Sequence, residues 1–202
     1  MAGQIFVISG PSGVGKTSII QDLRDELPEL RYSISHTTRK PRQGEQDGVN
    51  YHFTERTEFE DLIKENAFVE WAKVYTNLYG TSFKGLQEQI NQGLDVLLDI
   101  DVQGAANLKK HFKESCLIFI LPPSLEILAK RLRDRGTDDE ETIRTRQENI
   151  LKELKAAPIY DFFVVNNELD AAVQDTSAII QADRCSKTRM SDYISKEFGI
   201  KK

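Results

Sequence analysis

The sequence predicts an α/β fold in which a largely parallel sheet carries helices on both faces and a smaller α+β lobe is inserted into the core. Short apolar segments alternate with amphipathic ones along most of the chain, which is typical of parallel strands joined by helices. Between residues 34 and 93 this alternation gives way to short strand-like and turn-rich segments, which indicates the insertion.

The core elements follow in chain order. Candidate strands are short apolar runs, partly β-branched. They lie at Gln4–Ser9, Asp95–Ile100, Cys116–Leu121 and Phe162–Asn166. Candidate helices carry apolar residues at intervals of three and four. They lie at Thr17–Leu27, Val102–Phe112, Leu125–Arg135, Glu141–Ala156 and Asp170–Asp183. The charged tail after Arg184 is a terminal helix or a partly disordered segment.

The insertion contains its own candidate elements. Its strands are expected at Ser33–Arg39, Tyr51–Thr54 and Phe68–Val74, and its helices at Arg56–Asn66 and Lys84–Gly93. A second, very polar segment at residues 131–146 is expected to form a short lid. We therefore predict one domain over residues 1–202, with a core of 1–33 and 94–202, a lobe of 34–93 and a lid of 131–146.

The composition is that of an ordinary soluble globular chain, with 202 residues, 39% hydrophobic and 29% charged. A formal net charge of −5 gives no general attraction for nucleic acid. Cys116 and Cys185 lack metal-binding or redox spacing, and the first apolar run is too short for a signal peptide or membrane span. We expect a cytoplasmic protein that binds neither nucleic acid nor membrane and has no obligatory protein partner.

Residues 10–17 match the phosphate-binding pattern G-x-x-x-x-G-K-[ST] between a candidate strand and a candidate helix. In such a P-loop, backbone N–H groups and the helix N-terminus cradle phosphate. The lysine reaches the β- and γ-phosphates, and the Ser or Thr hydroxyl ligates Mg²⁺. The residues assigned to the triphosphate are Gly10, Pro11, Ser12, Gly13, Val14, Gly15, Lys16 and Thr17. The motif predicts a nucleoside triphosphate site, with Lys16 also a candidate catalytic residue.

Acidic residues follow the apolar run after residue 95, at Asp99 and Asp101. In P-loop proteins, a strand-terminal carboxylate commonly holds Mg²⁺ directly or through water. Such an aspartate can instead cap the following helix. Beside a P-loop, the metal role is favoured for Asp99. Asp101 lies on the same strand face and can point toward the same site.

Two groups of arginines stand out. Residues 131–146 contain Arg131, Arg133, Arg135, Arg144 and Arg146. They could form a solvated helix face, but we favour closure over a triphosphate, which is worth roughly 10³–10⁵ in rate. The second group, Arg39 and Arg42, lies among hydroxyl groups and Tyr51 in a turn-rich segment. An exposed basic loop is the common explanation, yet this composition also suits a phosphate monoester.

A triphosphate site together with a monophosphate site points to phosphoryl transfer between nucleotides. A phosphate acceptor is already an anion, so it needs no general base. Phosphoryl transfer to such an acceptor depends instead on the positioning of the two substrates and on relief of the charge repulsion between them.

The combined motifs resemble those of the guanylate kinase family from about Ile5 to Asp183. The matching blocks are FVISGPSGVGKT, SISHTTRKPRQGEQDGVNYHF, FVEWAKVYTNLYGTS, LLDIDVQGA, and KRLRDRG followed by IRTRQ. Two positions vary. His36 stands where the family pattern has a small hydroxyl residue, and Thr81 stands where serine also occurs. The combination is more specific than any single block.

The resemblance implies roles for individual residues. Those that hold the GMP phosphate are Arg39, Arg42, Tyr51 and Tyr79. Those that read the base are Ser35, Glu70, Thr81 and Asp101. Those that act catalytically around the ATP phosphates are Arg131, Arg135 and Arg146, and Asn166 lies near adenine. Guanine offers N1–H and N2–H₂ donors to a carboxylate and an O6 acceptor to a hydroxyl, and adenine does not.

The activity implied is Mg²⁺-dependent, in-line transfer of the ATP γ-phosphoryl group to GMP or dGMP, giving ADP and GDP for guanine nucleotide recycling. The lobe should close on GMP and the lid on ATP. One alternative is a P-loop kinase of another phosphate ester, which would need no guanine reader. Another is a phosphopeptide-binding module, which would lack the intact P-loop. A GTP-hydrolysing switch would carry an N-K-x-D motif, which we do not find.

Overall fold

The computed structural model describes residues 3–74, 76–134, 153–154 and 157–200. It confirms the predicted α/β class, because its main sheet has five strands, all parallel, in the order β2-β7-β1-β8-β9. These strands are β1 (Ile5–Ser9), β2 (Arg31–Tyr32), β7 (Val96–Asp99), β8 (Cys116–Leu121) and β9 (Phe162–Val165). Their carboxyl ends share one edge, where ligand-binding loops of such sheets gather.

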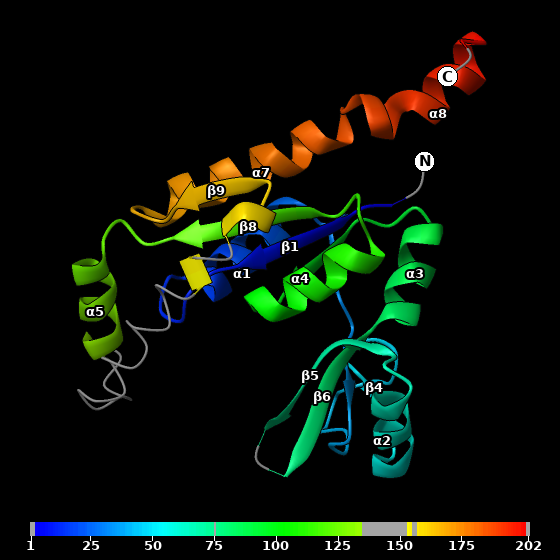
Figure 1. The fold of residues 1–202 in the computed structure, drawn as a ribbon, viewed down its shortest axis with the longest axis vertical. Coiled ribbons are helices and arrows are strands. Elements are labelled where there is room, and N and C mark those ends of the chain that lie inside the picture. Colours follow the sequence, from blue (N-terminus) through cyan, green and yellow to red (C-terminus); the bar gives the residue numbers. More distant parts are fainter. Residues whose placement is uncertain (1–2, 75, 135–152, 155–156, 201–202) are drawn as a thin grey trace.

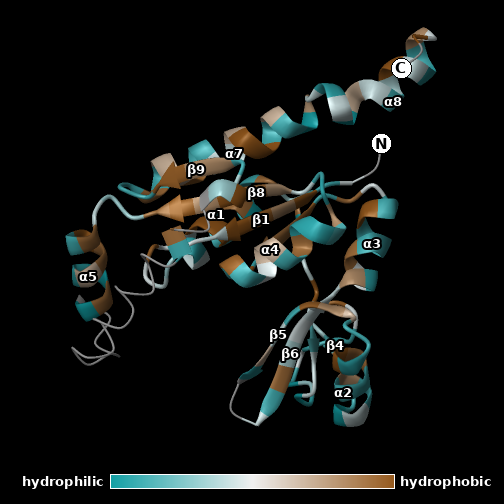
Figure 2. Ribbon diagram, in the orientation of Figure 1, coloured by the Kyte–Doolittle hydropathy of each residue, from teal (hydrophilic) through white to brown (hydrophobic). Residues whose placement is uncertain are grey.

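Helices cover both faces of this sheet (Figure 1). They are α1 (Lys16–Glu26), α3 (Phe83–Asn91), α4 (Val102–His111) and α7 (Leu169–Arg184). Phe6 and Ile8 belong to the apolar core shared with α1 and α7, whereas Ile5 and Val7 belong to the core shared with α3 and α4. None of these β1 residues is more than 1% exposed, and Figure 2 shows β1 and β8 as an apolar layer. Successive side chains of β1 point to opposite faces of the sheet, so this one strand contributes to both apolar cores.

A second sheet, formed by the inserted segment, stands apart from the main sheet in Figure 1. Its four strands have the order β4-β3-β6-β5. They are β3 (His36–Thr37), β4 (His52–Phe53), β5 (Phe68–Val74) and β6 (Asn77–Ser82). Phe59 of α2 (Arg56–Lys64) packs with Phe68 and Leu78 in a small separate core. The lobe therefore has an apolar core of its own, separate from the cores on the two faces of the main sheet.

The lobe differs in detail from the sequence prediction. The strand expected at Ser33–Arg39 is confined to β3, and the residues just before it form β2, the edge strand of the main sheet. β6 was not predicted, because Asn77–Ser82 is polar and contains Gly80. A Cβ on Gly80 would lie 3.0 Å from the Phe68 ring and 3.1 Å from the Phe59 ring, so close packing explains glycine in this strand.

The lid segment is described only in part. The expected helix Leu125–Arg135 is present as α5 (Leu125–Asp134). Arg135, Arg146 and nearly all of the expected helix Glu141–Ala156 lie outside the described residues. A short 3₁₀ turn at Ala157–Ile159 precedes β9. None of the helices in the described part of the chain has the length and apolar character that a membrane crossing requires.

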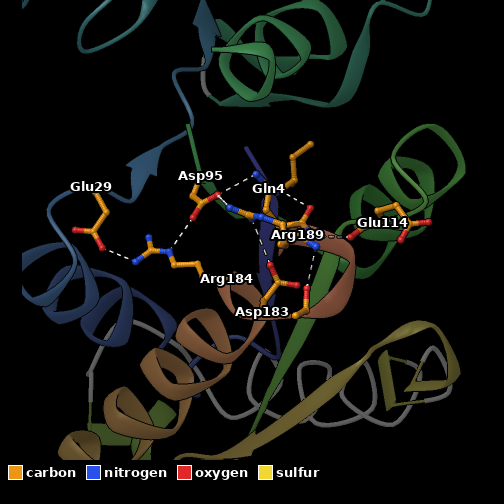
Figure 3. Close-up of polar contacts among 9 residues, drawn as sticks. Gln4, Glu29, Asp95, Glu114, Asp183, Arg184 and Arg189 are labelled. Carbon is orange, nitrogen blue, oxygen red and sulfur yellow. Dashed lines mark hydrogen bonds and ion pairs between the residues drawn. The ribbon is translucent and has the colours of Figure 1, made fainter. Parts of the chain in front are cut away.

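The tail after α7 continues as helix α8 (Lys187–Phe198). Its junction with α7 is fastened to Asp95, at the start of β7 (Figure 3). Asp95 is 7% exposed and accepts bonds of 2.9 Å from Arg184 Nε and from Arg189 Nη2, and one of 3.0 Å from the Gln4 backbone N–H. The junction between the two C-terminal helices is thus held at the amino end of the main sheet, opposite the edge that carries the P-loop.

Candidate active site

The P-loop joins the carboxyl end of β1 to α1. Gly10, Gly13 and Gly15 have φ angles of 148°, 88° and 100°, which glycine adopts without steric strain. Gly15 is the N-cap of α1 and has no side chain to satisfy the first N–H groups, which leaves them available to an anion. The Lys16 ammonium group donates to the Gly10 carbonyl at 2.7 Å and lies 3.9 Å from Asp99 Oδ1. The lysine therefore folds back over the loop.

Asn166, just after β9, supports the loop from the core. It is 5% exposed, and its Nδ2 donates to the Val14 carbonyl at 2.7 Å. A Cβ on Gly15 would lie 2.4 Å from this Nδ2, so packing as well as backbone conformation requires glycine there. The resemblance implied that Asn166 lies near adenine, and the structure places its side-chain amide against the P-loop backbone.

α5 brings Arg131 to the same region. Its Nη1 donates to the Asn166 carbonyl at 3.0 Å and its Nη2 to the Asn167 carbonyl at 3.3 Å. α5 also contacts the P-loop directly, because a Cβ on Gly13 would lie 2.7 Å from Leu132 Cδ2. Among the three arginines expected around the ATP phosphates, Arg131 is the one that the described residues include.

Thr17 and Asp99 are the expected metal ligands. Thr17 is exposed in the first turn of α1, and Asp99 ends β7 beside Ile8 of β1. Burial raises the pKa of Asp99, and Lys16 partly offsets that rise. Within the described residues, no three His, Cys, Asp or Glu side chains gather into a metal cage. One hydroxyl and one carboxylate suit Mg²⁺, which completes its octahedron with phosphate oxygens and water.

In the lobe, Arg39, Tyr51 and Tyr79 come together from separate segments. The Arg39 Cζ lies 5.4 Å from the centre of the Tyr51 ring, and the two tyrosine rings meet edge to face with centroids 5.9 Å apart. The hydrogen bonds from Arg39 to the Glu45 carboxylate raise the pKa of the arginine; burial opposes this rise and Tyr79 adds to it. A guanidinium group beside phenol hydroxyls is a fitting arrangement for a phosphate monoester.

Arg42 meets this group through its backbone, because its N–H donates to Glu45 Oε2 at 2.7 Å while its side chain is exposed. The sequence predicted no role for Glu45. Its bonds from Arg39 and from the Arg42 N–H lower its pKa to about 2. The available signal was Gly44, whose φ of 87° marks a turn that directs Glu45 back toward Arg39.

The expected base readers line the adjoining part of the lobe. Glu70 on β5 pairs in register with Thr81 on β6, and Ser35 Oγ lies 3.2 Å from Thr81 Oγ1. Burial raises the pKa of Glu70 to about 7, with further contributions from Asp101 and Asp99. The Glu70 carboxylate of the lobe therefore lies near two acids of the core, Asp99 at the end of β7 and Asp101 just after it.

Asp101 has a structural role as well. Its Oδ1 accepts a bond of 2.8 Å from the Gly104 N–H, so that it caps α4. A Cβ on Gly104 would lie 3.4 Å from Glu70 Oε2. The first turn of α4 thus lies against Glu70, and Asp101 caps that turn through one carboxylate oxygen.

A P-loop beside a strand-terminal carboxylate, together with an inserted lobe in which an arginine and two tyrosines lie together, is the arrangement that a P-loop kinase with a phosphorylated acceptor requires. The family model described as guanylate kinase matches residues 2–183. The chain is 47% identical to the guanylate kinase of Syntrophotalea carbinolica and 44% identical to that of Carboxydothermus hydrogenoformans. These alignments cover 98% of this chain and 94% and 97% of those proteins.

A solved structure is similar as well. The crystal structure of guanylate kinase from Anaplasma phagocytophilum superposes with a TM-score of 0.69 at 30% identity, covering 100% of this chain and 98% of that one. The chain belongs to the guanylate kinase family.

Proposed function

We propose that this enzyme transfers the γ-phosphoryl group of ATP to GMP or dGMP, in line and with Mg²⁺, giving ADP and GDP. The observation that supports it most is the pairing of Glu70 with Thr81 in the lobe that also holds Arg39. One end of this lobe offers a carboxylate and hydroxyls to a base, and the other offers a guanidinium to a phosphate. A nucleoside monophosphate has both groups.

Guanine specificity follows from hydrogen-bond chemistry. The Glu70 carboxylate can accept from N1–H and N2–H₂ of guanine, while Thr81 and Ser35 can donate to O6. Adenine has no N1–H, so AMP would leave a buried carboxylate without a donor. A site built in this way can reject the wrong substrate by factors of about 10⁴.

Transfer itself rests on positioning and charge. Lys16 and the N-terminus of α1 hold the β- and γ-phosphates, and Arg131 extends this positive surface from α5. Thr17 and Asp99 would hold Mg²⁺, which when bound neutralises phosphate charge and orients the oxygens. Arg39 presents the acceptor phosphate from the lobe. The two polyanions are then brought into line without a covalent enzyme intermediate.

The test is an ADP-release assay in which Mg-ATP is offered with GMP, dGMP, AMP, CMP or UMP separately. We expect rapid turnover with GMP and dGMP and a rate at least about 10³-fold lower in kcat/KM with AMP. Turnover with a different phosphate ester, and none with GMP, would instead support the alternative kinase. Tight ATP binding with no turnover on any acceptor would support a binding module.

A further inference from the structure

We propose that Glu45 is a positioning residue for the acceptor phosphate. It holds the Arg39 guanidinium by one edge, so that a second pair of parallel donors stays free for the phosphate of GMP. The inference rests on the proposed function and deepens it, because it adds a residue that shapes the phosphate site without binding the substrate itself.

The N–H donors of the Arg39 guanidinium form two parallel pairs, and Glu45 uses only one of them. Arg39 Nη1 donates to Glu45 Oε2 at 2.9 Å and Nη2 to Oε1 at 2.8 Å. Nη1 also donates to the Lys40 carbonyl at 2.9 Å. These bonds use both Nη1 hydrogens and one Nη2 hydrogen. Within the described part of the chain, the hydrogens that these bonds leave over are on Nε and Nη2. They point the same way from the planar group and form the fork that fits two phosphate oxygens.

The surroundings restrain the guanidinium in the other directions. The Tyr51 ring centre lies 5.4 Å from Arg39 Cζ, and the Phe53 ring centre lies at 5.8 Å. The side chains of Arg39 and Glu45 are only 14% and 20% exposed. An arginine already held in this way loses little further rotamer freedom when its ligand arrives.

Glu45 is itself held by the backbone, unlike a chance surface partner. Its N–H donates to the Arg42 carbonyl at 3.0 Å, and its Oε2 accepts the Arg42 N–H at 2.7 Å. Gly44 has a φ of 87° between them, and a Cβ there would meet nothing within 4 Å. The turn therefore serves to aim the Glu45 carboxylate rather than to fill a packed space.

A rival role is that Glu45 imitates the phosphate and must be expelled by GMP. A competing anion would occupy the fork that the phosphate uses. Glu45 instead takes the Nη1 and Nη2 end of Arg39 and leaves the Nε and Nη2 side for the phosphate. The two roles predict opposite changes in GMP affinity when the carboxylate is removed.

The experiment compares Glu45→Gln with wild type in steady-state kinetics. We expect the KM for GMP to rise about tenfold while kcat changes less than about twofold. Guanosine, which has the base but no phosphate, serves as an inhibitor, and its Ki should be unchanged. In an Arg39→Lys background, Glu45→Gln should add little, because the fork has already been removed. Glu60→Gln, which breaks an exposed arginine pair in the same lobe, is the matched control and should leave every constant unchanged.

An unchanged KM for GMP would overturn the inference, and a lowered KM would identify Glu45 as a competing anion. If the guanosine Ki rose in step with the GMP KM, Glu45 would be a folding residue of the lobe, and positioning would be excluded. The proposed function is judged separately, by whether the wild-type enzyme phosphorylates GMP at all.

Discussion

Glu70 is a single side chain whose surroundings shift its protonation into the neutral range. Burial, followed by Asp101 and Asp99, raises its pKa to about 7 from the ordinary value of 4.5. The folded protein therefore binds more protons than the unfolded chain between these two values. By linkage, the contribution of Glu70 to stability is greatest at low pH and declines as pH rises through this window.

Glu70→Gln removes this titration. We expect the free energy of unfolding of the variant to fall less than that of wild type between about pH 5 and pH 8, by about 1–3 kcal/mol. Urea denaturation at a series of pH values measures the difference. Glu60→Gln, on the exposed face of α2, should keep the wild-type slope. Equal slopes for Glu70→Gln and wild type would show that Glu70 does not lie in a buried position beside other acids.

Lys16 is the side chain of the P-loop that we expect to take part in phosphoryl transfer. Because its ammonium group lies over the P-loop, Lys16→Ala should lower kcat by about 10²–10³-fold. The KM for GMP should change little, since that substrate is held in the lobe. Lys64→Ala, which removes an exposed lysine paired with Asp61, is the control. A variant with normal kcat would show that Lys16 plays no part in transfer.

At the scale of elements, strands with an apolar pattern could be predicted from sequence, and polar strands could not. β1, β7 and β8 are buried on both faces and appear as apolar runs. β6 carries Tyr79 and Thr81 toward the candidate acceptor site, and Gly80 between them packs against aromatic rings. Its residues are mostly polar or small, which suits the candidate site and the close packing, so the sequence carries no apolar strand pattern there.

The candidate site shows the same division. The P-loop is one contiguous segment, so its motif alone indicated its strand, turn and helix. The candidate acceptor site joins residues from separate elements. Arg39 and Tyr51 could be grouped from their turn-rich segment, whereas Glu70 and Tyr79 could be added only through the family resemblance. Glu45 was missed because its role depends on a turn that brings it back to Arg39.

The junction of α7 and α8 depends on Asp95 (Figure 3). Asp95→Asn would leave Arg184 and Arg189 without their shared buried carboxylate, and we expect a loss of about 2–4 kcal/mol in the free energy of unfolding. The kinetic constants should stay normal, because this cluster lies at the edge opposite the P-loop. Urea denaturation and the GMP assay together test this expectation. Normal stability would show that the cluster does not hold the helices to the core.

At the scale of the whole molecule, the lobe and the core each carry part of the candidate acceptor site. Arg39 lies in the lobe and Asp101 in the core, so GMP that binds both should draw the two parts together. We expect the radius of gyration from small-angle X-ray scattering to fall when GMP saturates the enzyme. Arg39→Ala at the same GMP concentration should show no such change. An unchanged radius for saturated wild type would mean that the lobe does not close.

The central claim is that the P-loop and the lobe act together in a transfer between nucleotides. The measurement that tests it most directly follows the label from [γ-³²P]ATP in the presence of Mg²⁺ and GMP. We expect the label in GDP with wild type and almost none with Lys16→Ala. Label recovered as inorganic phosphate, or retained in ATP while GMP is present, would contradict the assignment of this protein as a GMP phosphotransferase.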